Sequence, residues 1–422
     1  MKKFLPEVCT IQYGFPFDSA KFSDSDGMPL IRIRDVVRGY SETYTTEEYK
    51  SEYIVHENDL LIGMDGEFNI AKWGKTPALL NQRVCRLAPK DSIDKYYLFY
   101  FMPIALKRIE EKTPFVTVKH LSAKELNKIE IPVLPLEEQR KIAETLSKVD
   151  ELIAFRDQQL AKLDELVKAR FVEMFGDMLL NSLGWSEKPL ECLADIVSGI
   201  TKGRKTTETD LQEVPYMAVS NVKNGYIDWT TVKTILATRQ EMEQYRLLPG
   251  DILMTEGGDP DKVGRGAIIK NPLENSIHQN HIFRVRLDES ELLPSFFAEY
   301  LQHQKAKRYF LGCAKQTTGI ASINMRQLKS LPVLLPPLSL QNDFAAFVER
   351  VDQQKQTVQQ SLEKLELLKK ALMQEYFGQL PQSPSVTAPS GREPLCGGKA
   401  KASLLEGGGA ALAVTEEVTT VI

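Results

Sequence analysis

Cysteine and histidine are scarce in this chain of 422 residues, which contains five of each. The cysteines stand singly at positions 9, 85, 192, 313 and 396, and no C-x-x-C pair occurs. This spacing supports neither a structural zinc site nor a disulfide framework, and it favours a reducing cytosol. The histidines show no metal-ligand spacing, so they are interpreted as surface or core residues and no bound metal is expected.

Long apolar runs are also missing. Nowhere do about 18 apolar residues follow one another, as a membrane-spanning helix requires. The start, MKKFLPEVCTIQYG, has no apolar core long enough for a signal peptide. We therefore expect a cytoplasmic protein with no membrane partner, and the length predicts two or three domains.

Motifs for catalysis and cofactor binding are absent. No G-x-G-x-x-G and no G-x-x-x-x-G-K-[ST] occurs, so neither a dinucleotide site nor an ATP motor is predicted. The run NPLE at 271–274 starts like an amino-methyltransferase motif but lacks the second proline and the aromatic residue that would clamp a flipped base. The run PDK at 260–262 resembles a nuclease fragment without its second carboxylate and lysine. We expect a non-catalytic chain without a cofactor.

What the chain does contain is a long amphipathic segment at 136–176 with no internal proline or glycine. Its apolar residues alternate at spacings of three and four, the heptad pattern of a helix that packs against a partner helix. About 40 residues at ~1.5 Å per residue predict a helix of about 60 Å. The predicted seam comprises Ile142, Leu146, Val149, Ile153, Leu160, Leu163, Val167 and Met174, with Arg156 and Arg170 as polar breaks.

The partner helix lies in the same chain, at 338–378. The matched pairs are each 202 positions apart, without a gap: Pro135 and Pro337, Gln139 and Gln341, Val149-Asp150 and Val351-Asp352, and Phe175-Gly176 and Phe377-Gly378. Because one offset persists along the whole segment, the chain is an internal duplication. The second seam comprises Phe344, Val348, Val351, Val358, Leu362, Leu365 and Leu372, with Lys355 and Lys369 as polar breaks.

The duplication extends to the segments that precede each long helix. Short apolar runs bounded by Gly, Asp and Asn recur in the same order and predict strands at 29–36 and 215–222, at 58–62 and 250–254, and at 81–87 and 279–285. Helices are predicted at 95–112 and 293–309, followed by extended Pro-rich links at 131–135 and 333–337. The end of the chain, 379–422, is rich in Gly, Ala, Ser and Pro and predicts a flexible tail.

This order of motifs resembles the specificity subunit of Type I restriction-modification enzymes over residues 1–378. The likeness is carried by PLEEQRKI at 135–142, GDIL at 250–253, LNQ at 80–82 and WSEKPLECLADIVSGITKG at 185–203. The resemblance implies an α+β fold in which two target-recognition domains alternate with two helices that form an antiparallel coiled coil, with a pseudo-two-fold internal repeat. The expected parts are recognition domains at 1–135 and 179–337, helices at 136–178 and 338–378, and the tail at 379–422.

The resemblance implies a non-catalytic subunit that binds double-stranded DNA at a bipartite target. Its expected partners are two DNA methyltransferase subunits and, through the complex, restriction and translocase subunits. Arginine can read guanine, and Asn or Gln can read adenine, through paired hydrogen bonds. The expected DNA-binding residues are loop cations and amides: Lys72, Lys75, Gln82, Lys119, His120, Lys202, Arg204, Lys205, Lys262, Arg265, Gln316, Thr317 and Asn324.

A surplus of positive charge is lacking as well, since the formal net charge is −4. DNA-binding proteins usually carry a basic domain, because phosphate contacts dominate affinity. The deficit is explained if methyltransferase partners supply most phosphate contacts and this chain supplies base readout. Two alternatives remain open on the sequence: a stand-alone DNA-binding regulator built as a dimer in one chain, and a coiled-coil scaffold that joins two protein-binding domains.

Overall fold

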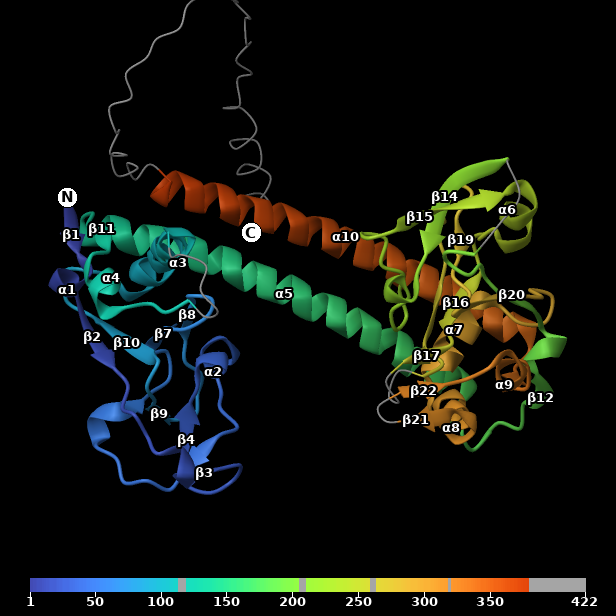
Figure 1. Cartoon of the computed structure of the whole chain (residues 1–422), viewed down its shortest axis with the longest axis horizontal. Coiled ribbons are helices and arrows are strands. Elements are labelled where there is room, and N and C mark those ends of the chain that lie inside the picture. Colours follow the sequence, from blue (N-terminus) through green and yellow to red (C-terminus); the bar gives the residue numbers. More distant parts are fainter. Residues whose placement is uncertain (113–118, 205–209, 259–262, 318–319, 379–422) are drawn as a thin grey trace, which may run out of the picture. The chain divides into compact units, whose positions relative to one another are not determined.

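The computed structural model describes residues 1–112, 119–204, 210–258, 263–317 and 320–378. The chain forms two compact units (Figure 1). The first unit is Met1–Arg156 together with Ser361–Ile422, and the second is Asp157–Gln360. The expected tail at 379–422 lies outside the described residues.

In the first unit, short strands, turns and helices precede the long helix. Its elements are β1 (Lys2–Phe4), α1 (Leu5–Val8), β2 (Cys9–Tyr13), η1 (Ser19–Lys21), β3 (Phe22–Ser23), β4 (Met28–Ile31), α2 (Ile33–Arg38), β5 (Tyr44–Thr45), η2 (Ser51–Tyr53), β6 (Ile54–Val55), β7 (Leu60–Gly63), β8 (Ile70–Lys72), β9 (Ala78–Leu80), β10 (Val84–Pro89), α3 (Lys95–Lys112), α4 (Ala123–Asn127), β11 (Glu130–Pro132) and the start of α5 (Leu136–Phe175).

The second unit has a similar, though not identical, order of strands, turns and helices. Its elements are β12 (Ser186–Pro189), η3 (Leu190–Cys192), β13 (Ala194–Ser198), β14 (Leu211–Met217), η4 (Val219–Asn221), β15 (Lys233–Thr238), α6 (Arg239–Tyr245), β16 (Ile252–Thr255), β17 (Gly257–Gly258), β18 (Gly266–Ile268), β19 (Ile277–His278), β20 (Ile282–Leu287), α7 (Pro294–Gln302), α8 (Gln304–Cys313), β21 (Lys315–Thr317), β22 (Ile320–Ser322), α9 (Met325–Lys329), β23 (Pro332–Leu335) and the start of α10 (Leu338–Phe377).

A four-stranded antiparallel sheet, here called the central sheet, forms the frame of each unit. Its strand order is β2-β10-β7-β8 in the first unit and β13-β20-β16-β18 in the second. The registers correspond: Val84 is opposite Gly63, as Ile282 is opposite Thr255. These registers define which residues of the two units are structurally equivalent.

One glycine in each unit is required by a close backbone approach beside the central sheet. A Cβ on Gly14 would lie 2.0 Å from the carbonyl oxygen of Asn81, and a Cβ on Gly199 would lie 1.9 Å from that of His278. The contact lets Gln82 N donate to Phe15 O at 2.9 Å in the first unit. In the second unit Asn280 N donates to Ile200 O at 3.0 Å. The turn before β10 and the turn before β20 are therefore held in the same way.

The strand predicted at 29–36 is only half correct. β4 ends at Ile31 and α2 begins at Ile33, because the Asp35 carboxylate accepts a hydrogen bond from Arg32 N at 2.9 Å and Gly39 ends the helix with φ +75°. The second unit makes the same turn at η4, where Asn221 Oδ1 accepts from Ala218 N at 3.0 Å. A side chain that caps its own turn overrode the β-branched pattern.

The helix predicted at 95–112 is confirmed as α3, whereas the single helix predicted at 293–309 is wrong. The second unit has two helices, α7 and α8, separated at His303, whose backbone is extended. The His303 ring lies 4.9 Å from that of Phe171 on α5. This contact between distant segments has no signal in the local spacing.

A buried glutamine at the start of each long helix ties that helix to its unit. Gln139 Oε1 accepts from Asp94 N at 2.8 Å, and its Nε2 donates to Ser92 O and Leu134 O. Gln341 Oε1 accepts from Leu293 N at 2.9 Å, and its Nε2 donates to Glu291 O and Pro336 O. Both side chains are fully buried, so each satisfies three backbone groups that water cannot reach.

The ends of the long helices belong to the hydrophobic cores of the units. In the first unit Leu146 of α5 and Phe377 of α10 share a core with α3 and the central sheet. In the second, Phe171 and Phe175 of α5 pack against Phe344 of α10, with ring centroids 5.4 and 5.5 Å apart. The start of one helix thus meets the end of the other, and the helices run antiparallel, which confirms the predicted fold class.

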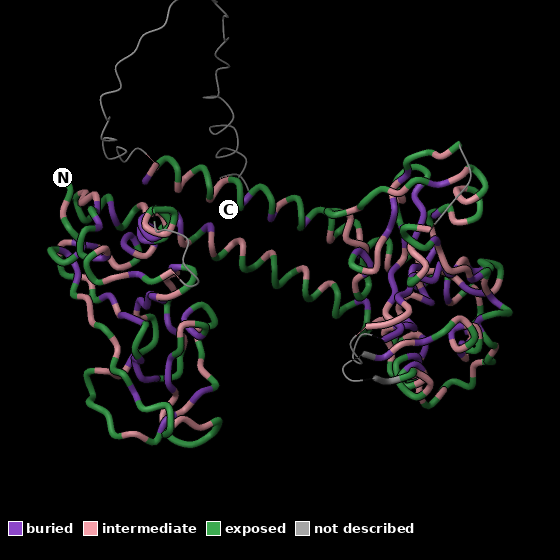
Figure 2. The backbone as a smooth tube through the Cα atoms, in the orientation of Figure 1, coloured by how far each residue is buried: buried purple, intermediate pink, exposed green. Residues whose placement is uncertain are grey.

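Along the helices, the predicted seam is more deeply buried in some places than in others (Figure 2). The buried members are Leu146, Val149, Val167, Phe344, Val351, Val358, Leu362 and Leu365, whereas Ile142, Ile153, Leu160, Leu163, Met174, Val348 and Leu372 are half-buried. Of the predicted polar breaks, Lys355 forms an ion pair with Asp164 in the second unit, and Lys369 lies 2.6 Å from Asp150 in the first. Helix α5 ends at Phe175, before the boundary expected at 178, because Gly176 takes φ +73°.

Among the residues that the structure describes, no helix combines the length and apolar character needed to cross a membrane. The described ranges also hold no group of three or more His, Cys, Asp and Glu side chains placed to bind one metal ion.

Candidate DNA interface

In the first unit, charged and amide side chains gather where β7 ends and β10 begins. His120 Nδ1 donates to the Asp65 carboxylate at 2.5 Å, and Arg83 Nε lies 3.6 Å from the other Asp65 oxygen. The Arg83 guanidinium also lies beside the imidazole, with Nη1 3.2 Å from His120 Nδ1. Gln82 precedes Arg83 in the same turn and is exposed. We call Asp65, Gln82, Arg83, Lys119 and His120 the first tip cluster.

The second unit has a cluster at the equivalent end of its central sheet. His281 Nδ1 donates to the Glu256 carboxylate at 2.6 Å. Asn280 Nδ2 lies 3.4 Å from His281 Nε2. The turn that carries exposed Lys202 begins at Ile200, whose carbonyl accepts from Asn280 N. We call Lys202, Glu256, Asn280 and His281 the second tip cluster.

The two clusters correspond at two positions, with different residues at each. Met64 N donates to Arg83 O at 2.9 Å, and Glu256 N donates to His281 O at 3.0 Å. Arg83 and His281 are therefore structurally equivalent, and so are Gln82 and Asn280, one position earlier. The nearby carboxylates are one register position apart, because Glu256 is equivalent to Met64 and Asp65 to Gly257. In both units, however, a carboxylate just after the neighbouring strand lies close to the cationic or imidazole side chain.

Several of the residues predicted from the sequence come together in these clusters. In the first unit they are Gln82, Lys119 and His120, although Lys119 Nζ is bound to Glu110 O at 2.9 Å and lies 3.5 Å from its carboxylate. In the second unit Lys202 is in the cluster. Arg265 lies at the same end, since its carbonyl accepts from Thr255 N, and its Nε is buried with no partner among the described residues.

Other predicted residues lie elsewhere or have structural partners. Lys72 lies at the opposite end of β7 and β8, with Nζ 5.3 and 5.1 Å from the ring centroids of Tyr96 and Phe99. Lys75 is exposed close to Lys72. The guanidinium of Arg204 is paired with the Glu241 carboxylate. Asn324 caps α9, where its Oδ1 accepts from Gln327 N at 2.9 Å.

Four predicted residues cannot be placed in this way. Lys205 and Lys262 lie outside the described residues, as do the side chains of Gln316 and Thr317. The backbone of Gln316 and Thr317 belongs to β21, which pairs with β22.

Arg83, Asn280 and His281 were not expected from the sequence. A signal for them was present, because the runs NQR at 81–83 and QNH at 279–281 occupy the same place in the duplication. Comparing the two runs position by position would have selected all three.

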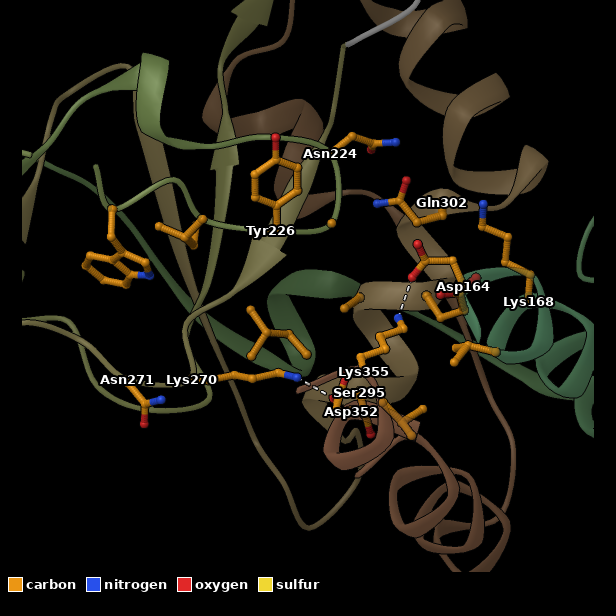
Figure 3. A pocket seen from close by; sticks show the side chains of 18 residues that line it. Asp164, Lys168, Asn224, Tyr226, Lys270, Asn271, Ser295, Gln302, Asp352 and Lys355 are labelled. Carbon is orange, nitrogen blue, oxygen red and sulfur yellow. Dashed lines mark hydrogen bonds and ion pairs between the residues drawn. The ribbon is translucent and has the colours of Figure 1, made fainter. Parts of the chain in front are cut away.

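The second unit also has a cavity of about 640 Å³, lined by residues of α5, α7, α10, β18 and the turn at 224–229 (Figure 3). Two ion pairs, Lys355 with Asp164 and Lys270 with Asp352, lie on its wall. Burial raises the pKa of the Glu299 carboxyl in this wall, and nearby Lys168 partly offsets the effect. Gln302 Nε2 is buried there with no hydrogen-bond partner among the described residues.

Comparison with known proteins identifies the family. The type I restriction modification DNA specificity domain is matched twice, by residues 1–165 and by residues 183–367. The chain belongs to this family. The specificity subunit thus carries two copies of the domain, in agreement with the duplication of helices and sheets.

Curated relatives match over most of their length. The specificity subunit of the type I restriction enzyme EcoBI from Escherichia coli is 28% identical over 377 residues, which cover 82% of this chain and 78% of the relative. The specificity subunit of the type I restriction enzyme MjaVIII from Methanocaldococcus jannaschii is 26% identical over 384 residues, 82% of this chain and 87% of the relative.

A solved structure shows the same fold. The S subunit of a type I restriction-modification system from M. genitalium aligns with 90% of this chain and 96% of its own, at a TM-score of 0.55 and 16% identity. The family match establishes that the function of this specificity subunit is DNA sequence recognition.

Proposed function

We propose that the specificity subunit recognises a bipartite DNA target, with one tip cluster reading each half. The observation that carries this proposal is the equivalence of Arg83 with His281 and of Gln82 with Asn280, where the two units place different side chains at the same two positions of the turn. Equivalent positions with different chemistry are what two half-sites of different sequence require. The family's role in DNA recognition selects this proposal over a scaffold without a DNA role.

The charges in the first tip cluster suit base readout more than phosphate binding. Arg83 is paired with Asp65, and Lys119 with Glu110. A cation that is already neutralised adds little to the attraction between protein and phosphates, which supplies most non-specific affinity. Base contacts specify sequence, whereas phosphate contacts position the protein. The net charge of −4 points the same way.

The proposed partners are two DNA methyltransferase subunits, which carry out the chemistry and make most phosphate contacts. Restriction and translocase subunits join through that complex, and the specificity subunit itself is non-catalytic. On this basis the subunit alone binds specific DNA weakly and binds it tightly in the complex. The competing proposal, a stand-alone regulator, requires tight binding by the isolated chain.

Methylome sequencing of cells that carry the complete system tests the bipartite target. The expected result is methylation at two short sequences separated by a fixed gap of unspecified bases. Replacement of residues 1–130 by another recognition domain should change one half and leave the other intact. A single contiguous target would contradict the proposal.

A gel-shift series at physiological salt tests the division of labour between the subunits. We expect the complex to bind the target at least a hundredfold more tightly than the specificity subunit alone. Nanomolar binding by the isolated chain would support the stand-alone regulator instead.

A further inference from the structure

The tip clusters share one arrangement that the proposed function does not by itself require. In each, a carboxylate just after the neighbouring strand lies close to the side chain at one equivalent position: Asp65 is 3.6 Å from Arg83 Nε, and Glu256 is 2.6 Å from His281 Nδ1. Those two side chains remain about half exposed, at 53% and 57%, although they are paired. A pairing that leaves the far side of a cation open can hold it in one orientation toward a ligand.

We infer that Arg83 and His281 are the equivalent base-reading residues of the two units, and that Asp65 and Glu256 are positioning residues that orient them. The inference rests on the proposed function, since it names residues that would read each half of the target. It further assigns a different class of base to each position.

Arg83 offers hydrogen-bond donors to a bound base. Asp65 lies 3.6 Å from the guanidinium at Nε, and Nη1 lies 3.2 Å from His120 Nδ1. Because His120 Nδ1 donates to Asp65, it accepts no hydrogen from Nη1, so both terminal Nη groups keep hydrogens for a ligand. Two parallel N–H groups match the O6 and N7 acceptors of guanine in the major groove. The first half-site is therefore expected to contain a guanine read by Arg83.

His281 offers a hydrogen-bond acceptor to a bound base. A carboxylate only accepts hydrogen bonds, so Nδ1 must donate to Glu256. In the neutral ring this leaves Nε2 as an acceptor, because the partner of one ring nitrogen fixes the state of the other. Asn280 Nδ2 lies 3.4 Å from Nε2 and can donate to it in the free protein. The ligand at this position should be a donor, the exocyclic amino group of adenine or cytosine.

The backbone provides a clean variant for the first position. Arg83 has φ +71°, a left-handed conformation that glycine adopts without strain. Arg83→Gly thus removes the side chain and keeps the turn. Lys202→Ala is the matched control, because Lys202 is an exposed cation in a tip cluster but has no carboxylate partner among the described residues.

The experiment selects bound duplexes from a library randomised at every target position, using the full chain in complex with its co-purified methyltransferase. Arg83→Gly should reduce discrimination at one guanine of the first half-site by roughly 5- to 150-fold and leave the second half-site unchanged. His281→Ala should relax one adenine or cytosine of the second half-site only. Lys202→Ala should weaken binding to all sequences alike and reduce the salt dependence.

The positioning role has its own readout. Asp65→Asn should relax the same guanine as Arg83→Gly, and Asp65→Glu should restore discrimination. In the Arg83→Gly background, Asp65→Asn should cause no further loss of discrimination at that guanine, since Asp65 acts on that base only through Arg83. Replacing that guanine by 7-deazaguanine should cost the parent complex affinity and leave the Arg83→Gly complex unaffected.

The outcomes separate the inference from the proposed function. A contiguous target for the parent complex contradicts the bipartite proposal itself. A bipartite parent whose base preferences survive Arg83→Gly and His281→Ala overturns the inference alone. Equal loss of binding to every sequence in those variants also overturns it, because that result is the signature of phosphate contacts.

Discussion

The two units differ in what fills the equivalent position beside the central sheet: aromatic rings in the first and a cavity in the second. Beside the central sheet of the first unit, Lys72 lies over Tyr96 and Phe99, and the Tyr100 hydroxyl donates to Asp150 at 2.8 Å. The register places Ile268 where the first unit has Lys72. The start of α7 places Ser295, Ala298 and Glu299 where α3 has Tyr96, Phe99 and Tyr100. The second unit consequently has a cavity where the first has two aromatic rings.

This difference separates the parts of the repeat that cannot vary from those that can. Gln139 and Gln341 make three equivalent hydrogen bonds each, and no other residue type supplies that combination of donors and acceptor at that reach. Tyr96 and Ser295 face partly open space, where size and polarity can change without leaving a buried group unsatisfied. The frame is thus retained by buried hydrogen bonds, while packing beside it diverges.

The largest effect is expected when the frame itself is broken. Gln341→Met leaves Leu293 N and two carbonyls buried without partners and should lower the free energy of unfolding by about 3–5 kcal/mol. Gln139→Met should do the same in the first unit. Denaturant titration measures both losses. The variants Asn342→Met and Arg140→Met, at exposed positions next to the two glutamines, are the controls. Losses below 1 kcal/mol would show that the glutamines are not what retains the frame.

The next effect is a dependence on pH that only the second unit has. Burial, reinforced by the nearby Arg284 guanidinium, lowers the pKa of His278 to about 4, while the equivalent residue of the first unit is Leu80. Between pH 6.5 and 4 the unfolded chain binds a proton that the folded chain does not, so stability falls as pH falls. The loss by pH 4 is about 3 kcal/mol.

Thermal melting of the parent and of His278→Leu between pH 7 and pH 4 tests this dependence. The variant should show a flatter profile in the transition of the second unit. Identical profiles for the two proteins would mean that His278 does not report the difference between the units.

A smaller effect is expected from exchanging the packing residues. Ala298→Phe with Ser295→Tyr fills the cavity with the residues of the first unit and should raise the free energy of unfolding by about 1–2 kcal/mol. Phe99→Ala should lower it by a similar amount, since Phe99 is half-buried. Denaturant titration measures both. A destabilised double variant would show that the cavity has a shape the aromatic rings cannot enter.

The smallest effect is expected from the ion pairs between the long helices. Lys355→Met and Lys369→Met each remove an exposed or half-exposed pair, which is worth about 0–1 kcal/mol and is screened by salt. Melting temperatures at low and high salt should therefore differ little from those of the parent. A loss of several kcal/mol would assign these seam lysines a role in holding the helices in register.

The sequence by itself determined the duplication, the two long helices and most of the strands. These features follow from local periodicity and from an offset of 202 positions, so they can be predicted without knowing any contact between distant segments. It also selected Gln82, Lys119, His120 and Lys202, because their positions in turns between predicted elements placed them at the surface.

Only the tertiary structure decided which loop residues converge. Lys72 and Lys119 look alike as loop cations in the sequence, yet Lys72 lies over aromatic rings of α3 and Lys119 belongs to the first tip cluster. His303 interrupts a helical pattern where it meets Phe171, a contact between segments more than 100 positions apart. The roles of Arg83 and His281 likewise depend on carboxylates brought close by strand pairing. Local pattern specifies the elements, whereas the side-chain chemistry of the site depends on which elements end side by side.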